Sequence, residues 1–171
     1  MRTPNLRQQA EQLGKILLAQ EKTLATADSL TGGGIAAELT AIPGSSAWFC
    51  GAFVTYVNDW KHRFLGVPMD TLERFDAVSG QTVHAMLQGL REKTGVDCAI
   101  AVSGFAGPSG GLPDRPVGTV FVGIAGPGWE AVQECHFKGS RAQIRRQTVR
   151  TAIGYTLMNQ PYTYIRSISI I

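Results

Sequence analysis

Hydrophobic and polar residues alternate along this chain with two periods, one typical of helices and one of strands. Near the start, four apolar residues lie three or four positions apart: Leu6, Ala10, Leu13 and Leu17. This spacing predicts a helix that begins at Thr3-Pro4 and runs to about Gln20. The same pattern predicts four further helices, over 35–42, over 59–65 behind a cap at Asn58, between Ser79 and Gly95, and between Ser140 and Asn159.

Runs with strand-like composition separate these helices. They cover residues 23–27, 48–57, 98–102, 117–125 and 131–137. The run at 98–102 is apolar throughout, which is typical of a strand buried on both faces. The last two runs flank Gly126-Pro127-Gly128 and predict a hairpin. Strands that alternate with helices, plus one hairpin, predict an α/β fold: a three-layer α/β/α sandwich around a mixed sheet.

The composition fits a single globular domain. Of 171 residues, 44% are hydrophobic and 17% charged, enough apolar material for one core. We expect one domain over 1–171, with a core at about 5–160 and an apolar tail at 161–171 that would dock on this chain or on another subunit. No run approaches the ~20 apolar residues of a membrane span. Charged residues interrupt the first twenty positions, so we expect no signal peptide, no membrane partner and a cytoplasmic location.

Positive charge is concentrated near the C-terminus. Residues 138–150 hold five basic residues and no acidic one, whereas the whole chain has a net charge of +3. A basic helix of this kind can bind nucleic acid, a small phosphate or an acidic partner, or can simply be a solvated face. Aromatic residues make up only 8% of the chain and do not interleave with the basic ones, so nucleic acid is not expected as a partner.

The first of three candidate loops follows the strand predicted at 23–27. It contains Asp28, Ser29, Thr31, Gly32 and Gly33. A hydroxyl at a sharp strand-to-helix turn can be held exposed beside backbone N–H groups that suit an oxyanion or a phosphate. The alternative is that Asp28 or Ser29 caps the next helix while the glycines permit tight packing.

The second loop, residues 55–61, ends in Lys61. With Asn58 as the cap, Lys61 occupies the third position of the helix, where the positive end of the helix dipole disfavours an ammonium group. A buried Lys61 should therefore have a lowered pKa, and it can then accept a proton from a serine, as in Ser-Lys variants of the catalytic triad. The alternative is an ordinary surface lysine.

The third loop, residues 103–111, begins with Ser103 and Gly104 and includes Gly107. Glycines behind a buried strand permit close approach of the backbone to a ligand. The segment has neither the Gly-Lys-Ser/Thr of a phosphate-binding P-loop nor a GxGxxG pattern. The alternative is a long surface loop without a ligand.

Patterns for metals and thiols are weak. His62, His84 and His136 share no metal-ligand spacing, so no zinc site is expected. Cys98 and Cys135 fall in predicted strands and are expected in the core. Cys50 is also expected in the core, with an exposed thiol as the alternative.

Several multi-residue motifs occur in an order typical of one family. A-E-S-C-T-G-G, P-G-S-S-A and G-F-V-T-Y-S-N-x-x-K correspond to residues 27–33, 43–47 and 52–61. A-V-S, S/T-G-I-A-G-P-x-G-G, K-P-V-G-T-V and R-x-x-V-R-x-Q correspond to residues 77–79, 103–111, 115–120 and 141–147. From about residue 13 to 157, the chain resembles the CinA C-terminal domain family, which includes stand-alone nicotinamide mononucleotide amidohydrolases.

The resemblance implies a reaction and a role for each matching residue. Active members hydrolyse the carboxamide of nicotinamide mononucleotide to nicotinic acid mononucleotide and ammonia, in pyridine nucleotide salvage. Ser29 would be the nucleophile, Lys61 its base and Tyr56 a proton-relay or orienting hydroxyl. Backbone N–H groups at 31–33 or at Gly104 would hold the oxyanion, and Arg145 or a neighbour would pair with the 5′-phosphate. The other substrate-binding positions implied are Asp28, Thr31, Gly32, Gly33, Asn58, Ser103 and Gly107. The resemblance implies no cofactor or metal, and it favours a homo-oligomer.

Several positions depart from the family motifs, and one of them is Cys50-Gly51-Ala52, which stands where the family commonly has an Arg-Gly pair. Asp28 replaces a glutamate, Leu30 a small residue, Val57 a serine and Gly80 a glutamate. Two hypotheses therefore stand side by side. The chain is either a nicotinamide-nucleotide amidase that uses Ser29 and Lys61, or a catalytically weak or inactive relative that binds a nucleotide or a protein partner. Binding without turnover would distinguish the second from the first.

Overall fold

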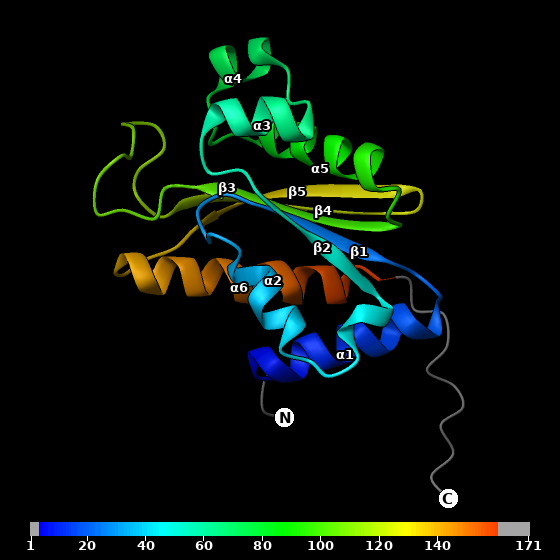
Figure 1. Cartoon of the computed structure of the whole chain (residues 1–171). Coiled ribbons are helices and arrows are strands. Elements are labelled where there is room, and N and C mark those ends of the chain that lie inside the picture. Colours follow the sequence, from blue (N-terminus) through cyan, green and yellow to red (C-terminus); the bar gives the residue numbers. More distant parts are fainter. Residues whose placement is uncertain (1–3, 161–171) are drawn as a thin grey trace, which may run out of the picture.

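A five-stranded sheet lies between two layers of helices in the computed structural model, which describes residues 4–160 (Figure 1). The strands are β1 (Leu24–Asp28), β2 (Phe49–Val54), β3 (Cys98–Gly104), β4 (Thr119–Gly126) and β5 (Trp129–His136). Their order is β2-β1-β3-β4-β5; β2, β1 and β3 are parallel, and β4 is antiparallel to both β3 and β5. The predicted α/β/α sandwich with a mixed sheet is confirmed.

Three helices cover each face of the sheet. On one face lie α1 (Leu6–Ala19), α2 (Gly34–Thr40) and α6 (Arg141–Met158); on the other lie α3 (Asn58–Leu65), α4 (Met69–Phe75) and α5 (Gly80–Thr94) (Figure 1). A single turn of 3-10 helix, Ser45–Ala47, precedes β2. The helices pack on the sheet through two separate apolar clusters, so each helical layer has a core of its own.

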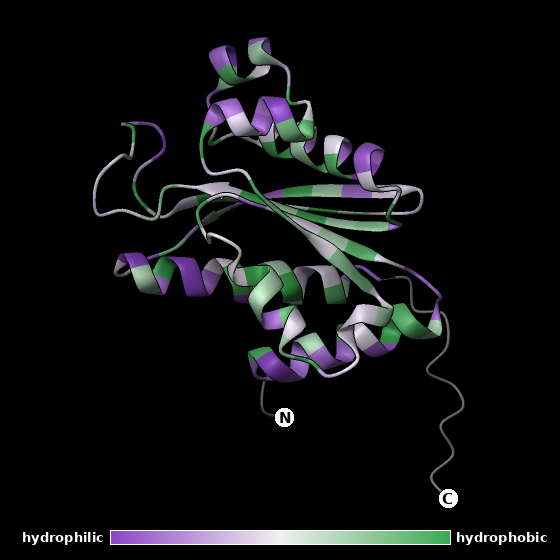
Figure 2. Ribbon diagram, viewed as in Figure 1, coloured by the Kyte–Doolittle hydropathy of each residue, from purple (hydrophilic) through white to green (hydrophobic). Residues whose placement is uncertain are grey.

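Strand β3 lies at the centre of the sheet, between the two helical layers, and this position explains its continuous apolar sequence. Cys98, Ile100 and Val102 pack toward α1, α2 and α6, while Ala99 and Ala101 pack toward α3, α4 and α5. All five are fully buried, and burial of each larger aliphatic side chain stabilises the fold by about 1.5–3 kcal/mol. In Figure 2 the strands are mostly green, whereas the helices carry much of the purple, hydrophilic surface.

Most predicted helix ends are confirmed, and the first is corrected. Ser140 and Gln143 form the capping box that opens α6, and Ser79 caps α5 before Gly95 ends it with a φ of 69°. Helix α1 begins at Leu6 rather than at Thr3-Pro4, because Asn5 and Gln8 form a reciprocal capping box there.

Two features of the segment after β2 differ from expectation. Helix α3 begins at Asn58 with Val57 as its N-cap, so Asn58 is not the cap and Lys61 is the fourth helical residue. Helix α4 was not predicted: it has only seven residues, and its apolar positions Met69, Leu72 and Phe75 fill a window too short to establish a helical period.

Two cysteine predictions hold and one is wrong. Cys98 is fully buried and Cys135 packs partly buried against the core, but Cys50 is exposed on the edge strand β2. In the part of the chain that the structure describes, no helix is both long and apolar enough to cross a bilayer. The apolar tail at 161–171 lies outside the described residues.

Candidate active site

The loop behind β1 occupies the position where sheets of this topology bind ligands. β1 continues through α2 to β2 on one side, whereas β3 pairs with its other side. Chain connections therefore leave in opposite directions at the carboxyl end of β1, which is the topological switch point of the sheet. Asp28 ends the strand here, and Ser29 follows it.

Ser29 and Lys61 are brought together from separate elements. Lys61 Nζ lies 3.1 Å from Ser29 Oγ and donates a second hydrogen bond, of 2.9 Å, to the carbonyl oxygen of Thr55. The Thr55 N–H in turn donates to the Asp28 carbonyl at 2.9 Å. The Thr55 backbone therefore ties the lysine to the serine loop, and the distance between the two side chains is within reach of proton transfer.

Burial favours the neutral form of Lys61, which is the form that can accept a proton. The side chain is fully buried and Ser29 is 8% exposed. Removal from water disfavours the ammonium form and lowers the pKa of Lys61 from 10.5 to about 8. The direction agrees with the expectation for a buried Lys61, and the cause is removal of the amine from water. A neutral amine can keep its hydrogen bond to Thr55 and accept the proton of Ser29.

The Asp28 carboxyl group forms no hydrogen bond with Lys61 in the described part of the chain. Its Oδ1 accepts a hydrogen bond of 2.5 Å from Thr31 Oγ1, while Oδ2 is buried without a partner among residues 4–160. Burial raises the pKa of Asp28 to about 6, an effect that the Thr31 hydrogen bond partly opposes. The carboxyl group therefore braces the turn that follows Ser29.

That turn presents free backbone N–H groups. Gly32 and Gly33 have φ values of 61° and 90°, which a side chain would strain. Gly33 is the N-cap of α2, so neither Asp28 nor Ser29 caps this helix. The Gly32 N–H donates to the Ser29 carbonyl at 3.0 Å, whereas the N–H groups of Thr31 and Gly33 have no hydrogen-bond partner in the described part of the chain. Free N–H groups two and four residues behind a serine suit a developing oxyanion.

Two arginines of α6 reach the loops of the site. Arg145 Nη2 donates to the Thr31 carbonyl at 2.7 Å, so the residue predicted to bind the 5′-phosphate contacts the serine loop. One turn earlier, Arg141 Nη2 donates to the hydroxyl of Tyr56 at 2.8 Å, and its Nη1 donates to the Gly107 carbonyl at 2.9 Å. The Tyr56 hydroxyl is therefore held by Arg141, and in residues 4–160 it forms no hydrogen bond with Ser29 or Lys61.

The glycine loop has structural reasons for its composition. A Cβ atom on Gly104 would lie 2.7 Å from Val120, and one on Gly107 would lie 2.5 Å from Val117. These glycines are required by contacts within the chain and are not in themselves evidence of a ligand. Ser103 is buried and donates to the Ala77 carbonyl at 2.6 Å. Asn58 is exposed at the start of α3.

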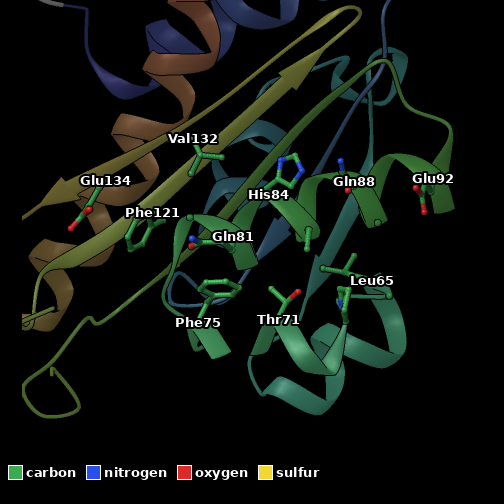
Figure 3. Close-up of a pocket in the computed structure, with 15 residues that line it drawn as sticks. Leu65, Thr71, Phe75, Gln81, His84, Gln88, Glu92, Phe121, Val132 and Glu134 are labelled. Atoms are coloured by element: carbon green, nitrogen blue, oxygen red, sulfur yellow. The ribbon is translucent and has the colours of Figure 1, made fainter. Parts of the chain in front are cut away.

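The departures from the family motifs fall in different places. Leu30 is buried in the core, and Val57 is exposed beside the site. Gly80 lines a groove of about 910 Å³ between α5, the α3–α4 segment and the β4–β5 hairpin, with Phe75, Gln81, His84 and Phe121 among its walls (Figure 3). Neither Ser29 nor Lys61 lines this groove.

Sequence reasoning missed two contributors to the site. One is the backbone carbonyl of Thr55. Every residue has such a group, so the sequence does not single out the one that binds Lys61. The other is Arg141, whose position at the first turn of α6 could have been read from its spacing of four residues before Arg145. Within residues 4–160, no group of three His, Cys, Asp or Glu side chains is arranged to hold a metal ion.

Comparison with known proteins gives one family. The family model described as the CinA C-terminal domain matches residues 6–159. Two relatives carry the name nicotinamide-nucleotide amidohydrolase PncC. The protein of Enterobacter agglomerans is 45% identical over 148 residues, covering 86% of this chain and 90% of its own length. That of Pseudomonas putida is 44% identical over 144 residues, covering 84% and 90%.

Other relatives are longer. A CinA-like protein of Geobacter metallireducens is 50% identical over 133 residues, which cover 78% of this chain but 32% of the relative, so the chain spans about a third of the length of such proteins. Among solved structures, the competence/damage inducible protein CihA of Agrobacterium tumefaciens has a TM-score of 0.88 at 38% identity, covering 94% of this chain and 99% of that one.

Proposed function

Since this chain belongs to the CinA C-terminal domain family, we propose that it is a nicotinamide-nucleotide amidase. The reaction is hydrolysis of the carboxamide of nicotinamide mononucleotide to nicotinic acid mononucleotide and ammonia. The observation that carries the proposal is the buried pair of Lys61 Nζ and Ser29 Oγ, 3.1 Å apart, at the ligand-binding end of the sheet. The names of the PncC relatives support the choice of substrate.

The pair supplies a nucleophile and a base for amide hydrolysis. Neutral Lys61 takes the hydroxyl proton as Ser29 Oγ attacks the carboxamide carbon, and the carbonyl oxygen becomes an oxyanion. Lys61 then gives the proton to the leaving nitrogen, ammonia departs, and an ester to Ser29 remains. Water attacks the ester with Lys61 again as base, which releases the carboxylate product and restores the serine.

Backbone N–H groups of the serine loop support the charged intermediate. We assign the oxyanion site to the N–H groups of Thr31 and Gly33, which the described chain leaves unpaired. Thr31 is held from two sides, by the Asp28 carboxyl at its hydroxyl and by Arg145 at its carbonyl. Donors fixed before the reaction stabilise developing charge without reorganisation, a contribution of about 3–4 kcal/mol for a single donor in related sites.

The pH dependence of the reaction tests the role of Lys61. Because the base must be neutral, and its pKa is lowered to about 8, kcat/KM is expected to rise about tenfold per pH unit below that value and to level off above it. Steady-state rates between pH 6 and pH 9.5 measure this directly. A flat profile across that range would exclude Lys61 as the general base.

The phosphate partner can be tested by comparing two substrates. Arg145→Ala is expected to raise KM for the mononucleotide by about 10- to 100-fold, since a charge-assisted hydrogen bond contributes about 1.5–3 kcal/mol. The unphosphorylated riboside should change by less than about threefold. Arg146→Ala, at an exposed position on the same helix, is the matched control. Equal weakening of both substrates would mean that Arg145 acts only through its bond to Thr31.

The proposed function itself is tested by ammonia release from nicotinamide mononucleotide by the purified protein. Turnover supports the amidase. Binding of the mononucleotide by isothermal titration calorimetry without turnover would instead identify a relative that keeps the pocket and lacks the chemistry. Absence of both would remove the mononucleotide from consideration.

A further inference from the structure

The groove between α5, the α3–α4 segment and the β4–β5 hairpin has a volume of about 910 Å³, which is in the range of pockets that bind small molecules (Figure 3). A second cavity, of about 390 Å³, adjoins it and shares five of its lining residues: Phe75, Gly80, Gln81, Phe121 and Glu134. The two cavities therefore form one continuous groove. The proposed amide hydrolysis makes no use of it.

Apolar side chains from three elements form part of the groove. Phe75 comes from α4, Phe121 from β4 and Val132 from β5, and all three are half-buried. Gly80, the first residue of α5, presents no side chain here. A Cβ atom on it would lie 3.8 Å from the Phe121 ring and 3.9 Å from Val132. A longer side chain at position 80 would therefore reach the space that these residues line.

Polar side chains of α5 line the groove beside this apolar part. Gln81, His84, Gln88 and Glu92 follow one another at spacings of three and four residues, so they share one face of the helix. His84 Nδ1 contacts a carboxylate oxygen of Glu130 on β5. When the ring is neutral, the proton on Nδ1 faces this carboxylate and Nε2 is left as an acceptor. This face of α5 therefore offers several acceptors to a ligand that carries N–H groups.

The larger cavity carries negative charge, although the whole chain has a net charge of +3. Glu92 and Glu134 line it, and Glu130 adjoins it through the contact with His84. Within residues 4–160, no lysine or arginine lines this cavity. Lys93 passes beside Gly66 at the rim. Carboxylates next to an aromatic ring suit a cation with an apolar body, because the ring face and the carboxylates both attract positive charge.

The smaller cavity contains two arginines that already have acidic partners. Arg115 donates to Asp76 at 2.9 Å and to Asp114 at 3.3 Å, and it also donates to two backbone carbonyls. Arg74 pairs with Asp70, and its guanidinium lies 5.4 Å from the centroid of the Phe75 ring. Because each arginine is matched by a carboxylate, neither favours an anion in the groove. The glutamates of the larger cavity therefore set its charge.

We propose that this groove binds a small organic cation, in which an ammonium group is attached to an aromatic or aliphatic body. The body packs against Phe121 and Val132 in the space beside Gly80. The ammonium group donates to the carboxylates of Glu92 and Glu134 and to the acceptors of α5. Such binding does not require the amidase activity, because the contacts involve neither Ser29 nor Lys61.

Three probes that share one ring and differ in charge test this inference. Phenethylamine is a cation at pH 7, phenethyl alcohol is neutral and phenylacetate is an anion. In two-dimensional amide NMR spectra of the full chain, the amine is expected to shift the signals of groove residues with a dissociation constant of about 1 mM or below. The alcohol and phenylacetate should each bind at least about tenfold more weakly.

Variants of the groove show where the amine binds. Gly80→Leu places a side chain beside Phe121 and Val132, at a position where a Cβ meets no atom closer than 3.8 Å. The circular dichroism spectrum should be unchanged, and the amine should bind at least about tenfold more weakly. Glu92→Gln combined with Glu134→Gln should weaken the amine about tenfold and leave the alcohol unaffected. Glu73→Gln, at an exposed position on α4 outside the groove, is the matched control and should bind the amine as wild type does.

Four results would each overturn the proposal. They are equal binding of the three probes, shifts confined to another surface, full affinity for the amine in Gly80→Leu or in the double glutamine variant, and no shift at about 20 mM amine.

Discussion

Ser29→Ala is expected to lower kcat for hydrolysis of nicotinamide mononucleotide by about 10⁴-fold or more, while the dissociation constant of the mononucleotide changes less than about threefold. The hydroxyl is the only nucleophile within hydrogen-bond distance of Lys61 in the described structure. Its removal leaves the backbone of the serine loop in place, because the Ser29 N–H and carbonyl hold the loop through bonds to Val102 and Gly32. The free N–H groups of Thr31 and Gly33 should thus remain available to substrate.

The measurement combines single-turnover ammonia release with calorimetric binding. Ser46→Ala, at an exposed position in the 3-10 turn, is the matched control and should retain full activity. A Ser29→Ala chain that turns over at more than about a tenth of the wild-type rate would refute the assignment of the nucleophile. Loss of binding equal to the loss of rate would place Ser29 in recognition instead.

Lys61→Met is expected to lower kcat about as strongly as Ser29→Ala, since nucleophile and base act as one unit. It should also make the folded chain more stable. Lowering the lysine pKa from 10.5 to about 8 corresponds to roughly 3 kcal/mol of unfavourable burial at neutral pH. Methionine fills similar space without a charge, but it leaves Ser29 and the Thr55 carbonyl without their hydrogen bonds. We therefore expect a net gain of about 1–2 kcal/mol in the free energy of unfolding.

The pH dependence of this stability difference gives a second readout. Below pH 8 the lysine is charged in both the folded and the unfolded chain, so the burial penalty is fully present. Between about 8 and 10.5 the unfolded chain holds a proton that the folded chain has released, and wild-type stability rises with pH relative to Lys61→Met.

Urea unfolding at pH 7 and pH 10 should therefore show the advantage of Lys61→Met shrinking at the higher pH. Lys93→Met, at an exposed position on α5, should show no such trend. A Lys61→Met chain that is less stable than wild type at pH 7 would mean that the two hydrogen bonds of Lys61 outweigh its burial.

The layers and most of the helix ends could be predicted from local signals. Ser140 and Ser79 mark the starts of α6 and α5 because each side chain accepts a hydrogen bond from a backbone N–H three residues later, and Gly95 marks the end of α5 through its positive φ. Helix α4 could not be predicted in this way, since its seven residues are too few to establish a helical period and its N-cap, Pro68, makes no side-chain capping bond. Asn58 has a side chain suited to capping, yet Val57 takes that position.

The sequence indicated the main residues of the site, but it did not indicate which of them contact one another. Ser29 and Lys61 stood out because each follows a strand, and the structure places them 3.1 Å apart. The partners of Tyr56, Ser103 and Gly107 depend on which loops meet in space, and sequence spacing does not encode that. Arg141 joins two of these loops from a helix 85 residues beyond Tyr56. A Cβ atom on Gly104 or Gly107 would collide with a neighbouring valine, so packing within the chain accounts for both glycines, and their predicted contact with a ligand stays a prediction.

The serine loop receives its base from one helical layer and its arginine from the other. Lys61 reaches it from α3 on one face of the sheet, and Arg145 reaches it from α6 on the other face, and each helix is anchored in a different apolar cluster. Neither half-assembled sandwich would hold both groups in place. Under the proposed function, turnover requires both helical layers to be folded. A newly synthesised chain is then expected to become active only after α6, its last described helix, has docked, and partial unfolding of either layer is expected to abolish turnover.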